Sequence, residues 1–313
     1  MVLAESLNSI AMIFIMIIPG IIIKKTGIIS EKEEKGIYSI VVNLTWPCLV
    51  IDAMQIPFSE KALIQCGYTF IITSCIFMFA IIIAFGLTWI LKTEKEKRYI
   101  FAFMLIFGNT GFMGMPIINA IYGKEALFYA SIVEMVQNIF LFTMGIFLIQ
   151  MSAGLNKKRN IKDIMTPGIF SVIIGFGLFV LDIELPSFLG ESIGIIGSAT
   201  TPLAMILLGT KLEGISFFKK IVKRPDTYIL SFFKLIIIPC IVMFFLIFVL
   251  KDTSLLANVI IIDFAMPVAA CAFIFSERYN GLTEFTVESV ILSTTISILT
   301  IPLFVILMKM AFA

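Results

Sequence analysis

Long apolar runs recur along the whole chain, and they limit its fold more than any other feature. Stretches of twenty or more mainly apolar residues follow one another, separated by short charged clusters. About twenty apolar residues in a helix cross the hydrocarbon core of a bilayer. Only 14% of the 313 residues are charged, whereas a soluble domain has roughly a quarter. The sequence therefore predicts an all-α polytopic membrane protein.

Charge clusters divide the chain into ten predicted transmembrane helices. The first run lacks basic residues before it and a small-residue cleavage site after it, so we expect a retained helix and not a signal peptide. The predicted spans lie near 7–24, 37–56, 62–91, 98–122, 126–151, 162–182, 188–210, 227–250, 255–277 and 283–310.

Lysine and arginine are distributed unevenly between the predicted connections. The connections after the first, third, fifth, seventh and ninth helices hold 18 basic residues, and the other connections with the tail hold four. Basic residues gather on the cytoplasmic side. The prediction is ten crossings of the cell membrane with both termini outside.

The stretch FGNTGFMGMPI, from Phe107 to Ile117, interrupts the fourth predicted helix. Proline lacks the N–H that a helix needs, and glycine loosens the backbone further. Peptide groups freed within a bilayer are tolerated only against protein or a water-filled cavity. We therefore expect this helix to unwind at Pro116 beside another protein segment.

Three features of the first half return in the second half at a nearly constant spacing. The separations are 155, 151 and 154 residues. Five helices repeated twice would be inverted in the membrane, and inverted repeats with matching broken helices are typical of secondary transporters. The alternative is that prolines are simply frequent in membrane helices. The pairs are Pro47 with Pro202, Pro116 with Pro267, and Glu134 with Glu288.

The repeat predicts that the broken fourth and ninth helices cross at mid-membrane. The N-termini of the half-helices would point their positive dipole ends at the crossing, which favours an anion. A substrate carboxylate would meet Asn109, the N–H groups from Gly111 to Gly114, and those after Pro267.

Several motifs resemble the auxin efflux carrier family of membrane transport proteins. They are NLTWPCLVI at 43–51, GNTGFMGMPI at 108–117 and AMPVAACAFIFSERY at 265–279. The resemblance covers essentially the whole chain and is closest to bacterial-type members, which have a short connection between the halves. It implies a five-plus-five inverted repeat like that of sodium/proton antiporters, and substrates that are organic anions such as malate, malonate or auxin-like acids.

The break and the resemblance together define the predicted substrate contacts. Cys271 stands where members of the family often have asparagine or another polar residue, which weakens the expected contact on that side. The predicted substrate-binding residues are Asn43, Asn109, Thr110, Gly111, Gly114, Pro116, Pro267 and Cys271.

Ionisable and polar residues inside predicted spans are costly and suggest function. A coupling cation, Na⁺ or H⁺, could travel with the anion, and the sequence leaves the choice open. Solvation is an alternative for the shallow Glu288 and for Asp52, and we expect Lys234 to extend its ammonium to the interface. The ion-coupling candidates are Glu134, Gln137, Asn138, Asp263 and Glu288.

The predicted carrier has two repeats, 1–155 and 156–313. The resemblance also implies a functional division. Helices within 7–56 and 162–210 would form a scaffold, and those within 62–151 and 227–310 would form the moving transport part.

Other functions are less compatible with the sequence. The chain has no histidine, which removes HExxH and rhomboid-like catalysis, and no GxGD or Walker A motif, so we expect no enzyme. A channel is an alternative, although pores usually form around an axis normal to the membrane. We expect no cofactor other than a coupling Na⁺ or H⁺, we identify no certain metal site, and we expect no nucleic-acid partner. The expected partners are a small organic anion, the lipid bilayer and a second copy in a homodimer.

Overall fold

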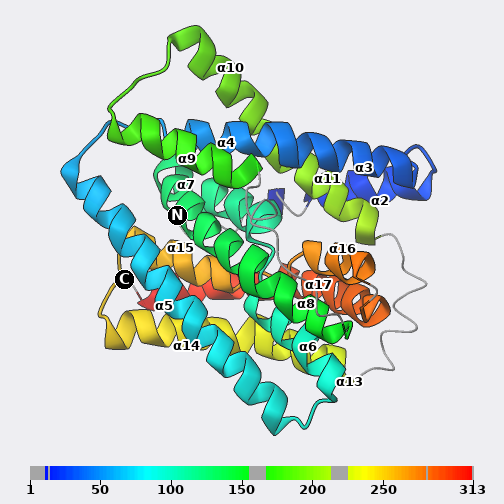
Figure 1. Ribbon diagram of the computed structural model, residues 1–313. Helices are drawn as coiled ribbons and strands as arrows, with labels where there is room; N and C mark the ends of the chain where they lie inside the picture. Colours follow the sequence, from blue (N-terminus) through cyan, green and yellow to red (C-terminus); the bar gives the residue numbers. More distant parts are fainter. Residues whose placement is uncertain (1–10, 13–14, 155–166, 213–224, 280, 312–313) are drawn as a thin grey trace. The chain divides into compact units, whose positions relative to one another are not determined.

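The computed structural model describes residues 11–12, 15–154, 167–212, 225–279 and 281–311. Within these ranges every regular element is a helix (Figure 1). The expected basic connections around 157–162 and 219–224 lie outside the described residues.

Six of the described helical stretches are long and apolar enough to cross a membrane. They run over Glu31–Ala53, Glu60–Ile90, Thr110–Ser152, Ser187–Leu207, Pro225–Val249 and Thr283–Met310. Two shorter apolar helices, α9 (Pro167–Val180) and α15 (Leu255–Phe264), accompany them. The chain is thus a polytopic membrane protein, as predicted, whereas the ten spans and the repeat stay predictions.

The individual helices often meet end to end through π-helical turns, in which the backbone makes one wider turn. The α-helices are α2 (Ile17–Lys25), α3 (Glu31–Ile40), α4 (Trp46–Ala53), α5 (Glu60–Ile90), α6 (Lys95–Ile106), α7 (Met115–Phe140), α8 (Ile146–Ser152), α9, α10 (Ser187–Ser198), α11 (Thr200–Leu212), α13 (Pro225–Phe232), α14 (Ile238–Phe244), α15, α16 (Cys271–Arg278) and α17 (Thr283–Ala311). The π-helical turns are η1 (Val41–Thr45), η2 (Thr110–Gly114), η3 (Leu141–Gly145), η6 (Phe233–Ile237) and η7 (Phe245–Val249).

Local sequence signals explain where some helices begin and divide. The second predicted span begins at Glu31 and not near 37, because Ser30 and Glu33 form a capping box in which the Ser30 N–H donates to the Glu33 carboxylate over 2.6 Å. Gly123 has a φ of 77° inside α7, a conformation suited to glycine. It separates the fourth predicted span from the fifth.

Both predicted interruptions are present as breaks in the helices. The fourth span consists of α6, an irregular segment at 107–109, η2 and the start of α7. The ninth consists of α15, an irregular segment at 265–270 and α16. Each break lies at the glycine- or proline-containing stretch that the sequence identifies, so the local backbone chemistry accounts for both.

The chain divides into two compact units. The first unit comprises the described residues of Met1–Phe70, Gly111–Met135 and Met165–Gly214. The second comprises those of Ile71–Thr110, Val136–Ile164 and Ile215–Ala313. The division into a scaffold and a moving transport part concerns movement, and it stays a prediction.

In the first unit, close helix contacts depend on glycine. The helix α2 packs against α11, and α4 packs against α9 and α10 (Figure 1). A Cβ placed on Gly20 would overlap the carbonyl oxygen of Ile206, and one on Gly197 would lie 2.8 Å from the Leu49 backbone. Small residues let membrane helices approach closely, and these glycines therefore fix the packing.

In the second unit, phenylalanine rings surround the break of the fourth span. Phe77 contacts Phe107, Phe140 and Phe264, with ring centroids 6.2, 5.4 and 5.0 Å away. Phe77 and Phe107 are fully buried. These rings cover the unwound backbone with protein, as irregular backbone inside a bilayer requires.

Candidate functional site

The two helix breaks pair with each other through backbone hydrogen bonds in the second unit. The Asn109 N–H donates to the Pro267 carbonyl over 2.8 Å, and the Ala269 N–H donates to the Phe107 carbonyl over 3.1 Å. Gly108 and Val268 form an antiparallel β-bridge between these bonds. Peptide groups that proline and glycine free from the helices are thereby satisfied by the other break.

The side chain of Asn109 is buried where the two breaks pair, and its amide NH₂ group donates no hydrogen bond to a described residue. Asn109 is 4% exposed, and its amide Nδ2 has no hydrogen-bond partner among the described residues. A buried donor without a partner costs about 1–3 kcal/mol. The arrangement keeps a hydrogen-bond donor available to a guest at the pairing.

Both breaks expose helix ends of opposite polarity. The π-helical turn η2 begins at Thr110 and α16 begins at Cys271, while α6 ends at Ile106 and α15 ends at Phe264. N-terminal ends carry partial positive charge and C-terminal ends partial negative charge. Cys271 is partly exposed and stands at the positive end of α16.

Side chains from neighbouring helices hold the broken segments in place. The Gln137 amide donates to the Gly108 carbonyl over 3.1 Å and also to the Thr110 hydroxyl. On the other break, the Val268 N–H donates to the Ser293 hydroxyl over 3.2 Å. Gln137, predicted to couple an ion, therefore positions the backbone of the fourth span.

Lys234 lies at the pairing and not at the membrane interface. Its side chain is fully buried, and its ammonium donates to the carbonyls of Leu105 over 3.2 Å and Ile106 over 3.4 Å. The expectation that Lys234 extends to the interface is wrong for this structure. The carbonyls at the break of the fourth span accept the hydrogen bonds of the ammonium. The Lys234 side chain therefore does not need to extend to the lipid headgroups to satisfy its charge.

Asp263 stands in the same enclosed space as Lys234. It is 3% exposed and lines a small cavity with Lys234, Gly108, Thr110 and Gln137. An electrostatic attraction links the Asp263 carboxylate to the Lys234 ammonium. The break thus holds a buried pair of opposite charges, of which sequence reasoning selected only the acid.

Several other predicted residues lie in the first unit. A Cβ on Gly111 would lie 3.0 Å from the Trp46 ring and 3.2 Å from the Glu134 carboxylate. Trp46 donates its indole N–H to the Met115 sulfur over 3.2 Å. Gly114 and Pro116 are buried. Trp46 packs against the segment that follows the break, and nothing in the local sequence pattern marked it as a site residue.

The remaining predicted residues differ in their surroundings. Asn43 is exposed and donates its amide to the Ser39 carbonyl over 2.8 Å and to the Ser39 hydroxyl over 3.1 Å. Asn138 is 6% exposed and Glu288 is 1% exposed. Because Glu288 is buried in protein, solvation does not account for its position.

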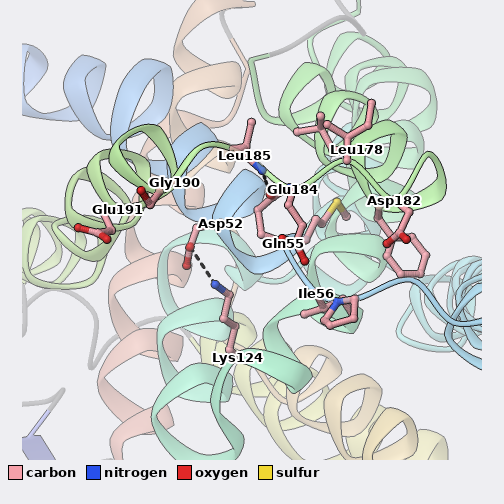
Figure 2. Close-up of a pocket in the computed structure, with 15 residues that line it drawn as sticks. Asp52, Gln55, Ile56, Lys124, Leu178, Asp182, Glu184, Leu185, Gly190 and Glu191 are labelled. Carbon is pink, nitrogen blue, oxygen red and sulfur yellow. Dashed lines mark hydrogen bonds and ion pairs between the residues drawn. The ribbon is translucent and has the colours of Figure 1, made fainter.

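A larger cavity in the first unit is less suited to an anion. It encloses about 310 Å³, and Figure 2 shows Lys124 facing Asp52 across it, 2.9 Å apart. Both partners are partly exposed, in keeping with a solvated Asp52. Three further acids, Asp182, Glu184 and Glu191, line the space. Four carboxylates and one ammonium repel a carboxylate, so this cavity is a poorer candidate for an anion site than the paired breaks.

Comparison with known proteins identifies the family. The membrane transport protein family, which is that of the auxin efflux carriers, matches residues 6–305. The chain belongs to this family. Membership of this transport family supports transport as the activity, and the family is one of transporters and not of enzymes.

Similar members of the membrane transport protein family span nearly the full length of the chain. An uncharacterized transporter of Methanocaldococcus jannaschii is 26% identical over 306 residues, which cover 95% of this chain and 97% of that protein. One of Methanothermobacter thermautotrophicus is 23% identical, covering 97% and 98%. The uncharacterized transporter YfdV of Escherichia coli is 19% identical, covering 88% and 89%.

Proposed function

We propose that the protein is a secondary active carrier of small organic anions, with carboxylates such as malate, malonate or auxin-like acids as substrates. One observation carries this proposal: the two breaks pair through Asn109 and Pro267, beside a buried amide donor without a partner. A carboxylate accepts hydrogen bonds from amide and backbone N–H groups, and these are strong because the acceptor is charged.

The positive ends of η2 and α16 attract the same guest. Thr110 and Cys271, at the first positions of these elements, are the proposed flanking contacts. Gly111 has no room for a larger side chain, because a Cβ there would lie 3.0 Å from the Trp46 ring.

We further propose ten transmembrane helices in a five-plus-five inverted repeat, with the breaks crossing at mid-membrane and alternating access as the mechanism. The matched breaks before α7 and in front of α16 support the repeat, and transporters place their sites between such broken helices. In this proposal the protein lies in the cell membrane with both termini outside and forms a homodimer.

A coupled cation is a competing variant of this function, and sodium- or pH-dependent uptake would favour it. The buried carboxylates Glu134, Asp263 and Glu288 could carry a proton, or contribute to a sodium site with Asn138. A sodium- or proton-coupled symporter of another solute with the same fold is therefore the second candidate. A channel is the third, and it differs by lacking saturable exchange.

Uptake of labelled carboxylates into proteoliposomes tests the proposal, with sodium and pH varied separately. We expect saturable uptake of at least one short carboxylate, and severe loss of flux in Asn109→Ala and Asp263→Asn while both variants remain folded. Unchanged transport in both variants would remove the proposed site.

A further inference from the structure

The buried Lys234 has a definite place in the electrostatics of the paired breaks. Its ammonium donates to Leu105 and Ile106, which are the last two residues of α6. A cation at the C-terminal end of a helix offsets the partial negative charge there. Lys234 therefore neutralises the negative end of the half-helix that leads into the break.

The same ammonium also faces a full negative charge. Asp263, one residue before the end of α15, lines the small cavity with Lys234 and attracts its ammonium. Without that ammonium, a buried carboxylate and two negative helix ends would surround the break. A carboxylate substrate would be repelled there, because like charges in a low-dielectric interior interact strongly.

The space between these groups is filled. A Cβ on Gly108 would lie 3.3 Å from the Asp263 carbonyl oxygen and 3.4 Å from the Lys234 nitrogen. The cavity at this point leaves no room for a water molecule. Its lining includes Lys234, Asp263, Thr110 and Gln137. The ammonium thus already occupies the space beside Asp263 that a sodium ion at this carboxylate would need.

Resting on the proposed carrier function, we propose that Lys234 is the resident cation of the paired breaks and determines that the site accepts an anion. Its ammonium takes the position that a coupling sodium ion would occupy, balances Asp263 and the end of α6, and leaves the positive ends of η2 and α16 to the substrate. Lys234 is a positioning residue in this account, since it acts on the substrate through Asp263 and the helix ends. Transport is consequently independent of sodium.

Charge-neutralising variants test the balance between Lys234 and Asp263. We expect Lys234→Met and Asp263→Asn each to lower carboxylate uptake by about tenfold or more, because each leaves one buried charge without its counter-charge. The double variant, which removes both charges, should recover most of the uptake. Lys124→Met removes the same charge from a half-exposed ion pair and should transport normally. Wild-type uptake by Lys234→Met, or a double variant as impaired as the two single losses combined, would overturn the proposal.

Thermal unfolding in detergent tests the same inference without any substrate. The wild-type midpoint should be equal in sodium chloride and choline chloride, whereas Lys234→Ala, which vacates the position beside Asp263, should be stabilised by sodium. A wild-type protein that sodium stabilises, or whose uptake requires sodium, would contradict the inference. Suppose that no carboxylate is transported, but sodium stabilises only Lys234→Ala and not the wild type. The proposed function would then be wrong, whereas the inference that Lys234 balances the charge of Asp263 would remain supported.

Discussion

At the scale of single residues, the proposed site depends on a hydrogen-bond donor that the fold leaves unused. Asn109 gives its backbone N–H to Pro267 and keeps its side-chain amide without a partner among the described residues. The backbone contact does not require an amide side chain. Substitution of the side chain should therefore affect the guest more than the fold.

Asn109→Ala should raise the KM for a transported carboxylate by about ten- to a hundredfold, because a hydrogen bond to a charged group contributes about 1.5–3 kcal/mol. Asn109→Asp should be worse, since it adds a like charge. Asn119→Ala, an equal change at an exposed position of α7, serves as the control in proteoliposome kinetics. Equal KM values for Asn109→Ala and Asn119→Ala would refute a contact between Asn109 and substrate.

Ser293→Ala removes the acceptor of the Val268 N–H and should lower the free energy of unfolding by about 1–3 kcal/mol. Ser297→Ala is the matched control, because its hydroxyl donates within its own helix to Thr294. Midpoints of thermal unfolding compare the two. A smaller loss for Ser293→Ala than for Ser297→Ala would show that the break does not rely on this bond.

Single residues also mark where sequence reasoning stops. Asn109 was predictable because glycines and a proline surround it and mark the break locally. The position of Lys234 was not predictable, since its acceptors Leu105 and Ile106 lie 129 and 128 residues away in the chain. A lysine within an apolar span was a signal of function, but its partners appear only when the helices are packed.

At the scale of helices, glycine determines how closely α2 approaches α11. Gly20→Ala should destabilise the protein by about 3 kcal/mol, because its Cβ would overlap the Ile206 backbone and overpacking costs about this much. Gly67→Ala, in α5 with open space around it, should be neutral or stabilising by up to about 1 kcal/mol. Thermal unfolding in detergent compares them. Equal midpoints would show that this approach of α2 and α11 does not hold in the protein.

The helices themselves were predicted unevenly. Both breaks were predicted from proline and glycine, whose backbone effects are local. The π-helical turns η3, η6 and η7 were not, because no residue type marks them and tertiary packing selects them. Lys234 lies in η6, so neither this π-helical turn nor the buried position of its lysine was predicted from the sequence.

At the scale of the whole molecule, basic residues predict the topology. In a variant with its five cysteines replaced, a cysteine at Thr253 should react with a membrane-impermeant thiol reagent from outside the cell. One at Lys92 should react only after the membrane is opened. Both positions are exposed, so side-chain burial does not confound the comparison. Reaction of both from the same side would refute the predicted orientation.

Hydropathy and charge asymmetry, which act over whole segments, were sufficient to predict a helical membrane protein. They could not identify the transported compound, because recognition depends on a few contacts whose spacing the sequence does not contain. Length and apolar character also do not establish that α9 and α15 cross the membrane, because both helices are shorter than a usual span. Their assignment as crossings rests on the proposed repeat.

The most direct measurement is counterflow in proteoliposomes, in which unlabelled carboxylate inside the vesicles drives entry of the labelled compound. We expect internal carboxylate to accelerate labelled uptake, and we expect this acceleration to saturate and to be severely reduced in Asn109→Ala. Uptake that internal carboxylate leaves unchanged, or acceleration that Asn109→Ala retains in full, would contradict an anion carrier built on the paired breaks.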